Sequence, residues 1–504
     1  MTLIKNLQRG ARQHPDAIAY LFEDQSATYG EFYQSVKNTA VNLAGQGIGK
    51  GDTVALLLGN SPHFLITYYG ALLAGAAVVP INPIYTPHEI SFILQNSRTK
   101  LAVAAAPLLP AFEALHGKLP DLQRVVLIGG TSEHDWTMPY EELIAHSIAD
   151  FEAPALEEDD IAVILYTSGT TGVPKGAMLT HQNLASNADS IAQYLTVNAE
   201  DRFVTVLPMF HVFCMTVCMN APIAIGASMI IIPRFSPTEV VRMIREKHAT
   251  VFVGVPTMYN FILQTPGVTP ADLDSLRICI SGGASLPVAL LHNFEEKFNK
   301  KISEGYGLSE ASPVTAFNPV DGVRKPGSIG VDIPGVRNKI VDEEGEELPR
   351  GQVGELIVQG PNVMKGYLNL PEETAMTLQN GWLHTGDMAY MDEDGYIFIV
   401  DRKKDLIIVG GYNVYPREVE EVLYHHPQVV EAAVIGAPDE NQGEIVQAYV
   451  VRQDDSLTEE ALREHCRSEL AKYKVPHSIV FIKELPKNTT GKILRRALRD
   501  VIAR

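Results

Sequence analysis

The sequence predicts an α/β protein in which a large N-terminal domain of α/β sheets and a β-rich subdomain precede a small α+β C-terminal domain. Short apolar runs alternate with helical signals between residues 28 and 281, which is typical of mostly parallel sheets covered by helices. Short β-type runs in a glycine-rich stretch follow at 327–365. The chain of 504 residues has room for roughly three domain-sized units.

Capping signals and apolar runs define the elements of the N-terminal domain. Thr28 with Glu31, and Thr86 with Glu89, form capping boxes that open helices, the second with proline at the first helical position. Helices are expected from Thr28 towards Leu43, at 63–73 and at 182–194. Strands are expected at 54–58, 77–81, 101–104, 125–128, 161–165, 203–207, 251–255 and 278–281.

The last third of the chain predicts a subdomain and a separate C-terminal unit. The subdomain has β-type runs at 338–341, 355–358 and 396–400. Five consecutive charged residues, 401–405, then mark a polar boundary. Beyond it we expect strands at 406–409, 434–435 and 445–451 and helices at 416–423, 457–470 and 493–502. We therefore predict an N-terminal domain over 1–401 and a C-terminal domain over 402–504.

Composition argues against several classes of protein. The formal net charge of −19 makes a broad nucleic-acid partner unexpected. Four cysteines without zinc-type spacing favour a reducing, cytoplasmic setting. Residues 1–15 lack the apolar core of a signal peptide. Polar and helix-breaking residues interrupt the apolar stretch 212–232, so a buried helix followed by a strand is favoured over a membrane span. Contact with a membrane surface and the choice between monomer and homodimer stay open.

The segment 166–176 carries the clearest functional signal. It follows an apolar run and combines hydroxyl side chains, glycines and Lys175. Glycines let backbone N–H groups approach a ligand closely, and hydroxyls and a cation add partners for a polyphosphate. The patterns of a Walker A loop and of a dinucleotide fingerprint are both absent from it. A Ser/Thr/Gly linker is the competing interpretation, but linkers seldom follow a buried strand.

Three further segments carry chemical signals. Gly282-Gly283-Ala284-Ser285 follows a strand, and its two glycines allow close approach to a flat ring. The segment 304–310 reads Glu-Gly-Tyr-Gly-Leu-Ser-Glu, and 486–492 reads Pro-Lys-Asn-Thr-Thr-Gly-Lys. Asp387 is expected at the end of a turn, where a carboxylate can accept two O–H bonds from a vicinal diol. A surface bend or a turn cap would explain some of these segments taken singly.

Together these segments resemble the signature motifs of the adenylate-forming superfamily, which comprises acyl-CoA synthetases, adenylation domains of peptide synthetases and luciferases. The resemblance covers nearly the whole chain and is nearest to bacterial fatty-acid–CoA ligases. It implies an ATP-dependent, AMP-forming ligase that makes an acyl-adenylate and then a thioester, with ATP, Mg²⁺ and coenzyme A. It also implies that the C-terminal domain is mobile. Ser309 stands where the family has threonine, and the hydroxyl is retained.

The resemblance implies a role for each site residue. Glu310 would bind Mg²⁺, Asp387 would hold the ribose, and Lys492 would contact the carboxylate and the α-phosphate. The remaining nucleotide contacts would be Thr167, Ser168, Gly169, Thr170, Thr171, Lys175, Gly283, Ala284, Ser285, Tyr306, Gly307, Ser309 and Arg402. For the second step, Lys404 is the expected pivot of a hinge near 401–405, and the tunnel for the thiol would be lined by Gly410 and Gly411.

The expected acyl pocket is apolar, which favours a fatty or aryl acid. His211 would stand at its junction with the thiol tunnel, as a wall or gate and not as a proton carrier, although a lone histidine is more often a core residue. Malonate-activating relatives tend to carry arginine at the position of Gly305, so the glycine is expected to leave room for a long or wide acyl group. We favour a medium- to long-chain fatty acid; a hydroxycinnamate- or benzoate-like acid and the loading of a carrier protein are the alternatives. The remaining expected lining is Phe213, Met215, Val255, Tyr259, Gly282, Pro313 and Val314.

Overall fold

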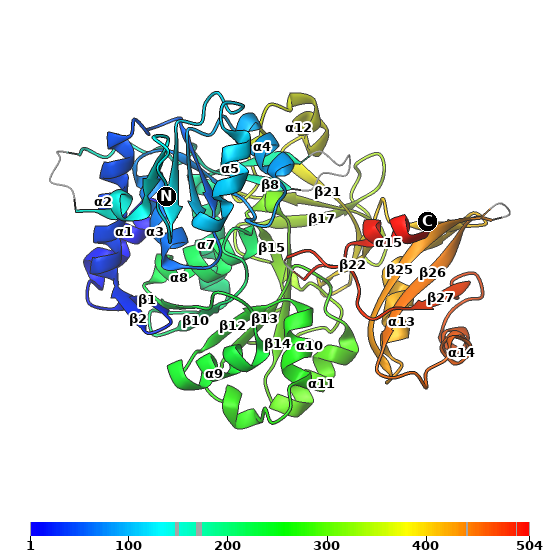
Figure 1. The fold of residues 1–504 in the computed structure, drawn as a ribbon. Coiled ribbons are helices and arrows are strands. Elements are labelled where there is room, and N and C mark those ends of the chain that lie inside the picture. Colours follow the sequence, from blue (N-terminus) through cyan, green and yellow to red (C-terminus); the bar gives the residue numbers. More distant parts are fainter. Residues whose placement is uncertain (1, 147–150, 168–173, 440–441, 490, 503–504) are drawn as a thin grey trace.

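The computed structural model describes residues 2–146, 151–167, 174–439, 442–489 and 491–502. Figure 1 shows a large lobe in blue to green, a β-rich part in yellow, and a small lobe in orange and red at one side. The chain therefore has the predicted α/β architecture, with a large N-terminal part and a smaller C-terminal part.

The first large sheet has eight strands in the order β19-β9-β8-β4-β3-β5-β6-β7. Strands β3 to β8 pair in parallel, whereas β8 with β9 and β9 with β19 are antiparallel. The segment 166–176 therefore connects two neighbouring antiparallel strands. The bounds are β3 Thr53–Leu57, β4 Ala77–Pro80, β5 Leu101–Ala105, β6 Arg124–Ile128, β7 Thr137–Pro139, β8 Ile161–Thr167, β9 Lys175–Thr180 and β19 Gly366–Tyr367.

The second large sheet has nine strands in the order β16-β15-β14-β13-β12-β10-β11-β1-β2. Its middle strands are parallel, and its two ends are antiparallel. The bounds are β1 Ile18–Phe22, β2 Gln25–Thr28, β10 Arg202–Thr205, β11 Ser228–Ile231, β12 Val251–Gly254, β13 Ile278–Ser281, β14 Ile302–Gly307, β15 Val314–Phe317 and β16 Val331–Asp332.

Helices pack between and around these sheets. The capping boxes at Thr28 and Thr86 are both present, so these two predicted helix starts are confirmed. Helix α3 is buried along almost its whole length, and one apolar cluster contains residues of both large sheets. The helices are α1 Leu3–Gln13, α2 Tyr29–Gly45, α3 Pro62–Leu73, α4 Pro87–Asn96, α5 Leu109–Leu115, α6 Tyr140–Ile144, α7 His181–Tyr194, α8 Ala221–Ile225, α9 Pro237–Lys247, α10 Pro256–Gln264 and α11 Val288–Phe298.

The apolar stretch 212–232 folds inside the large lobe. It forms a π-helix over Cys214–Asn220, then α8, then β11, and nearly all of it is buried. The predicted helix followed by a strand is therefore confirmed, with π geometry in the first turns. Within the described parts of the chain, no helix is both long and apolar enough to span a bilayer.

The β-rich subdomain is an antiparallel sheet that adjoins the large lobe. Its strands are β17 Arg337–Val341, β18 Gly354–Gln359, β20 Leu378–Gln379, β21 Trp382–Met391 and β22 Ile397–Arg402, and α12 Pro371–Thr377 lies beside it. Asp387 was expected at the end of a turn, but it lies inside β21. There it pairs with Arg402 of β22, so the ladder and not a turn fixes its backbone.

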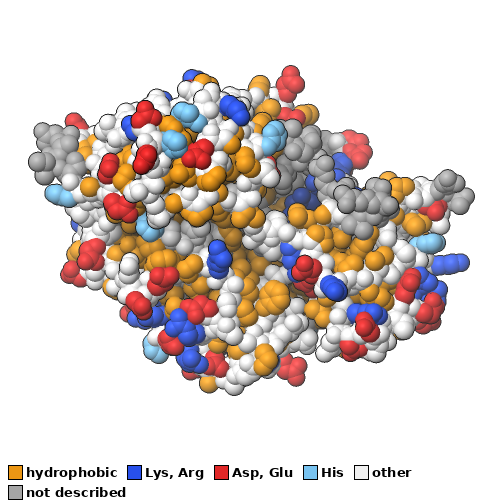
Figure 2. Space-filling model, viewed as in Figure 1, with side chains coloured by type: hydrophobic (Ala, Val, Ile, Leu, Met, Phe, Trp, Pro, Cys, Tyr) orange, Lys and Arg blue, Asp and Glu red, His pale blue; other side chains and the backbone are white. Residues whose placement is uncertain are grey.

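The small lobe has apolar clusters of its own, formed by residues from Ile407 to Leu498. Two long strands, β25 and β26, form its centre, and the parallel strand β27 extends their sheet. The bounds are β23 Ile407–Val409, β24 Tyr412–Val414, α13 Pro416–Tyr424, β25 Val429–Asp439, β26 Gly443–Arg452, α14 Glu459–Glu469, β27 Ser478–Phe481 and α15 Arg495–Ile502. On the face seen in Figure 2, acidic and basic side chains are interspersed over both lobes, with apolar side chains between them.

Candidate active site between the two lobes

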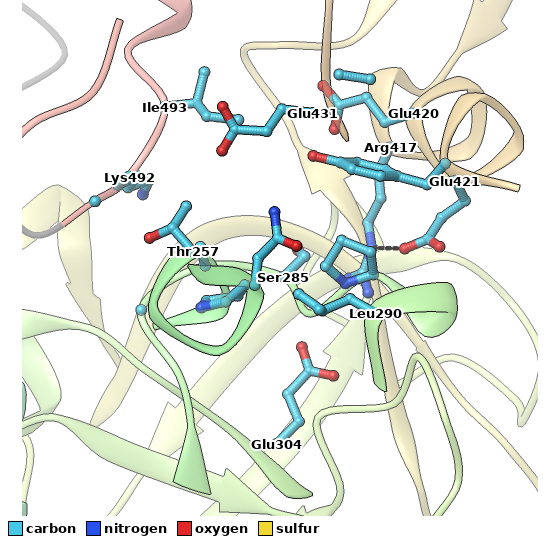
Figure 3. Close-up of a pocket in the computed structure, with 18 of the residues that line it drawn as sticks. Thr257, Ser285, Leu290, Glu304, Arg417, Glu420, Glu421, Glu431, Lys492 and Ile493 are labelled. Atoms are coloured by element: carbon cyan, nitrogen blue, oxygen red, sulfur yellow. Dashed lines mark ion pairs between the residues drawn. The ribbon is translucent and has the colours of Figure 1, made fainter. Parts of the chain in front are cut away.

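A cavity of about 340 Å³ lies where the large lobe, the subdomain and the small lobe meet. In Figure 3 its lower wall comes from the large lobe and carries Thr257, Ser285 and Glu304. Lys492 enters from the chain before α15, and the opposite wall comes from the small lobe. Side chains far apart in sequence therefore face one space. The nucleotide-site candidates that line it are Gly283, Ala284, Ser285, Tyr306, Gly307, Asp387, Arg402 and Lys492.

Three of the predicted residues form one cluster: Tyr306 lies on β14 of the second large sheet, and Asp387 and Arg402 lie on the paired strands β21 and β22. The Tyr306 hydroxyl donates a hydrogen bond to Asp387 Oδ2, and Arg402 Nε lies 3.4 Å from Asp387 Oδ1. Burial and the Asp387 charge raise the pKa of Tyr306 well above its usual range, so its hydroxyl stays protonated. The cluster thus brings together a flat aromatic ring and a carboxylate of the N-terminal part and a cation, Arg402, at the 401–405 boundary.

The glycine-rich segment after β13 lies against a residue of the expected acyl pocket. A Cβ on Gly282 would stand 2.9 Å from Cζ of Phe213, so the glycine allows that ring to pack closely. Gly283 has a φ of +77°, a left-handed conformation that favours glycine. A Cβ there would contact Val255 Cγ1 at 3.5 Å. Phe213 and Val255 are thus brought to the nucleotide segment.

Glu304 lines the cavity and is a candidate that sequence reasoning missed. Its side chain is 5% exposed and accepts a hydrogen bond of 3.0 Å from the backbone N–H of Leu286. Burial raises the pKa of Glu304 to about 7, while the nearby Arg417 charge opposes that rise. A charged residue just before Gly-Tyr-Gly at the end of a buried strand was the signal that could have identified it.

Lys175, the first residue of β9, and Glu310 belong to a second polar cluster. Lys175 Nζ forms an ion pair with Glu373 of α12 and lies 5.5 Å from the centre of the Tyr367 ring. The Tyr367 hydroxyl donates to Glu310 Oε1 over 2.8 Å. Sequence reasoning missed Tyr367 and Glu373, which join the lysine of the expected phosphate site to the expected metal ligand. Thr167 ends β8, and Ser168, Gly169, Thr170 and Thr171 lie outside the described residues.

Lys492 projects from a tightly turned segment of the small lobe. Its backbone N–H donates to Asn488 Oδ1 and its carbonyl accepts from the Asn488 N–H, both over 2.9 Å. The side chain keeps contact with solvent in the cavity. Even so, the surrounding protein and the charge of Arg402 lower the pKa of Lys492 to about 8, although Asp387 opposes this. The ammonium form of Lys492 therefore predominates at pH 7 but loses its proton as the pH rises through about 8.

His211 is within electrostatic reach of Lys492. Burial, together with the positive charge of Lys492, lowers the pKa of His211 to about 4. Its Nδ1 accepts a hydrogen bond of 3.3 Å from the backbone N–H of Phe213. The imidazole is therefore neutral at pH 7 and holds the chain beside the Phe213 ring.

Two residues of the expected acyl pocket have neighbours that their local sequence does not show. Tyr259 is fully buried; its hydroxyl donates to the Ile280 carbonyl over 2.7 Å, and its ring packs edge-on against Phe252 and Phe294. Tyr259 is therefore packed among core residues, and its place at the acyl pocket stays a prediction. Gly305 does not leave open room, because a Cβ there would lie 2.2 Å from Cδ2 of Phe317. The cross-strand Phe317 ring fills that space.

The remaining expected residues lie in two other places. Met215, Pro313 and Val314 are buried and are not part of the cavity lining. Gly410 and Gly411 form the turn between β23 and β24, with φ values of +55° and +86°, and they also lie outside that lining. Lys404 lies in the connection between β22 and β23, where burial and the charge of Arg402 lower its pKa. In this lobe arrangement Lys492 lines the cavity with Tyr306, Asp387 and Arg402, whereas the Gly410-Gly411 turn lies outside its lining.

Comparisons with known proteins cover nearly the whole chain. The model of the AMP-binding enzyme family matches residues 7–368, and that of the AMP-binding enzyme C-terminal domain matches residues 418–492. The long-chain-fatty-acid–CoA ligase of Bacillus subtilis is 42% identical over 99% of this chain and 94% of its own.

Two solved structures show the same fold. The anthranilate CoA ligase AuaEII in complex with anthranoyl-AMP superposes with a TM-score of 0.93 at 30% identity, covering 99% of this chain and 97% of that one. MatB from Rhodopseudomonas palustris, 34% identical with 99% of both chains covered, superposes with a TM-score of 0.92 in its ATP-bound form. Its apo form superposes with a TM-score of 0.82 at 35% identity.

Proposed function

The chain belongs to the AMP-binding enzyme family, and from that premise we propose that it is an ATP-dependent, AMP-forming ligase that joins a long-chain fatty acid to CoA. One observation carries the proposal. Lys492 of the small lobe lines the same cavity as Tyr306, Asp387 and Arg402. A cation on one lobe thus faces a cluster on the other that suits an adenosine.

The chemistry explains why such a cavity needs both lobes. A carboxylate is a poor electrophile, and it becomes reactive towards a thiol only after gaining a leaving group such as AMP. To reach the α-phosphate of ATP, the carboxylate must approach a highly negative triphosphate. The Lys492 ammonium offsets that repulsion and stabilises the charge that develops during transfer. Positioning and electrostatics therefore do most of the work, as in other phosphate transfers.

The nucleotide is assigned to the cluster of the large lobe. Adenine would lie between the Tyr306 ring and the Gly283-Ala284-Ser285 segment, which lines the same cavity. Asp387 would accept hydrogen bonds from the ribose hydroxyls. Arg402 would offset the charge of Asp387 or contact a phosphate of ATP. Gly307 and Ser309 complete this side. The phosphates would meet Lys175 and the segment before it, including Thr167.

Glu310 is the residue that would hold Mg²⁺. Mg²⁺ is a hard cation that is commonly bound by one or two carboxylates together with substrate phosphates. Glu310 fits that role because Tyr367 bonds only one of its oxygens in the described contacts and Lys175 stands nearby. When bound, the ion would neutralise phosphate charge beside Glu310.

His211 acts as a wall or gate in this scheme. With a pKa of about 4 it is uncharged at neutral pH, so it lacks the imidazolium proton that a general acid would transfer. It lies at the start of the apolar segment that includes Phe213, beside Gly282. We assign Met215, Val255, Pro313 and Val314 to the same apolar region, which a fatty acyl chain would enter.

The second step needs another arrangement of the lobes. After pyrophosphate leaves, the thiol of CoA must reach the acyl-adenylate, and Lys492 occupies the approach. We assign the hinge to 401–405 with Lys404 as its pivot, which divides the chain into 1–401 and 402–504. Rotation would bring the Gly410-Gly411 turn to the cavity, where backbone without side chains leaves a path for pantetheine.

The acid is the least constrained part of the proposal. A long-chain fatty acid is favoured because the ligase from Bacillus subtilis acts on one by name and matches over 99% of this chain. An aryl acid is the second candidate, since the anthranilate CoA ligase AuaEII superposes with a TM-score of 0.93. We also propose that the protein works in the cytoplasm, where its proposed substrates ATP and CoA are available.

An ATP–pyrophosphate exchange assay across a panel of acids, with and without CoA, tests the proposal. We expect exchange to be fastest with medium- to long-chain fatty acids, and CoA to accelerate AMP release. Fastest exchange with benzoate- or cinnamate-like acids would transfer the assignment to an aryl acid. AMP release that free CoA leaves unchanged would favour a carrier-protein thiol as acceptor. Failure to make labelled ATP with any acid would overturn the proposal.

A further inference from the structure

The segment 486–492, which carries Lys492, contacts the large lobe through Thr489 and Gly491. Asn82 Nδ2 donates a hydrogen bond of 3.0 Å to Thr489 Oγ1. A Cβ on Gly491 would lie only 2.8 Å from Oγ1 of Thr257, so the segment passes tightly against α10. Asn82 follows β4 of the first large sheet, whereas α10 follows β12 of the second. The segment therefore rests on both sheets.

A hydrogen bond within the large lobe orients the amide group of Asn82. The residue is 8% exposed, and its Oδ1 accepts a hydrogen bond of 3.2 Å from the backbone N–H of Ile84. That bond leaves the Nδ2 end to face the small lobe. A buried donor in a set orientation loses little conformational entropy when it finds an acceptor.

The turn that carries Thr489 is rigid enough to transmit this contact to Lys492. Asn488 and Lys492 exchange two hydrogen bonds of 2.9 Å, and Gly491 N–H donates to the Asn488 carbonyl over 3.0 Å. Lys487 Nζ anchors the same turn to the small lobe through Glu431 Oε1, 2.5 Å away. Holding Thr489 therefore holds the backbone from which the Lys492 side chain projects.

We infer that Asn82 is a positioning residue for Lys492 in the adenylation step, acting through Thr489. The inference rests on the proposed function, because adenylation is the step that needs Lys492. The thioester step, which requires the small lobe to turn away, breaks this hydrogen bond and does not depend on it. The contact thus favours one lobe arrangement over the other.

The kinetic test compares two half-reactions in the full-length enzyme. One is ATP–pyrophosphate exchange, and the other is thioester formation from preformed acyl-AMP and CoA. Asn82→Ala and Thr489→Val are each expected to slow exchange by about 3- to 10-fold, the value of one hydrogen bond, and to leave the thioester step unchanged. The double variant is expected to be no slower than the slower single variant, because both changes remove the same bond. Thr489→Ser, which keeps the hydroxyl, is expected to retain the normal rate.

A matched control distinguishes the Asn82–Thr489 hydrogen bond, here called the tether, from the local turn that Asn82 makes with Ile84. Asn198 Oδ1 accepts from the backbone N–H of Glu200, two residues on, just as Asn82 Oδ1 accepts from Ile84, but Asn198 is exposed and outside the cavity lining. Asn198→Ala is expected to leave exchange unchanged. Additive losses in the double variant, equal losses in both half-reactions, or a normal rate for Thr489→Val would overturn the inference. Thr489→Val also decides the matter if Asn82→Ala fails to fold.

Hydrogen exchange of the backbone amides at 486–492 gives a readout without turnover. In the full-length protein without substrates, Asn82→Ala is expected to speed exchange in that segment, whereas Asn198→Ala leaves it unchanged. If no acid supports pyrophosphate exchange but this protection is lost in Asn82→Ala, the proposed function fails and the tether stands. Unchanged protection in an active enzyme overturns the tether and leaves the function intact.

Discussion

The two sides of the active-site cavity are built in different ways. On the nucleotide side, Tyr306, Asp387 and Arg402 come from three strands and are joined directly to one another. On the other side, Lys492 comes from a connection between β27 and α15 that lies against the large lobe. The first side is part of the scaffold, whereas the second is present only while the small lobe keeps its place.

The two lysines of the site show the same contrast. Lys175 is held by Glu373 within the N-terminal part of the chain and lies over the Tyr367 ring. Burial, together with the charges of Arg402, Arg495 and Lys404, lowers the pKa of Lys492, and Asp387 only partly opposes this. A cation in such surroundings gains most when an anionic substrate arrives. We therefore expect substitutions of Tyr306, Asp387 or Arg402 to slow both half-reactions. Substitution of Lys492, which the small lobe brings to the cavity, should slow only adenylation.

Removing Lys492 should give the largest effect. Lys492→Ala is expected to slow adenylation by about 10²- to 10³-fold, because it deletes a preorganised cation at the site where charge develops. Thioester formation from preformed acyl-AMP should stay near normal. Rapid-quench measurement of each half-reaction provides the check. An equal loss in both steps would falsify the assignment of Lys492 to the first one.

A change on the scaffold side should affect both steps. Asp387→Asn removes the charge that faces Arg402 and weakens acceptance of the ribose hydroxyls. We expect the dissociation constants of ATP and of AMP each to rise about tenfold, the value of a charge-assisted hydrogen bond. Titration calorimetry measures both constants directly. If only ATP binding weakened, Asp387 would act on the phosphates and not on the ribose. The assignment of Asp387 to a nucleotide site used in both steps would then be wrong.

The Gly410-Gly411 turn tests the opposite face of the small lobe. Gly411 has a φ of +86°, and a Cβ there would meet nothing within 4 Å in this arrangement. Gly411→Leu is thus expected to leave adenylation nearly unchanged apart from a backbone penalty of about 1 kcal/mol. It should slow thioester formation about fivefold by narrowing the path of the thiol. A normal rate of CoA transfer would contradict the tunnel assignment.

Sequence reasoning did best where the signal is local. Capping at Thr28 and Thr86 depends on residues three apart, and both predicted helix starts are present. Apolar runs likewise identified the parallel strands, because buried strands of this kind are apolar on both faces. The motif residues Tyr306, Asp387 and Lys492 line one cavity.

It did worst where a distant partner decides the outcome. The space beside Gly305 belongs to Phe317 on the neighbouring strand, and no pattern around Gly305 shows that. The helix α10 has two sides: Thr257 and Asn260 face the cavity, whereas Tyr259 faces the core. Glu373 was missed for the same reason, since its partner is 198 positions away.

The smallest predicted effect is the response of adenylation to a rise from pH 7 to pH 8. Because Lys492 has a lowered pKa of about 8, its ammonium form is nearly complete at pH 7, about half at pH 8 and about one tenth at pH 9. If only the ammonium form supports adenylation, kcat/KM for exchange should fall about twofold between pH 7 and pH 8. It should then fall more steeply above pH 8.

Lys492→Arg supplies the control, since arginine keeps its proton throughout this range. Whatever its absolute rate, that variant should lose the fall above pH 8. The thioester step should not share the decline, because Lys492 has then left the site and the CoA thiol becomes more reactive as pH rises. An exchange rate that stays flat to pH 9.5 in the unmodified enzyme would mean that a bound anion restores the pKa of Lys492. The lysine would then be part of a preformed site, as Lys175 is, and the contrast between the two sides would be lost.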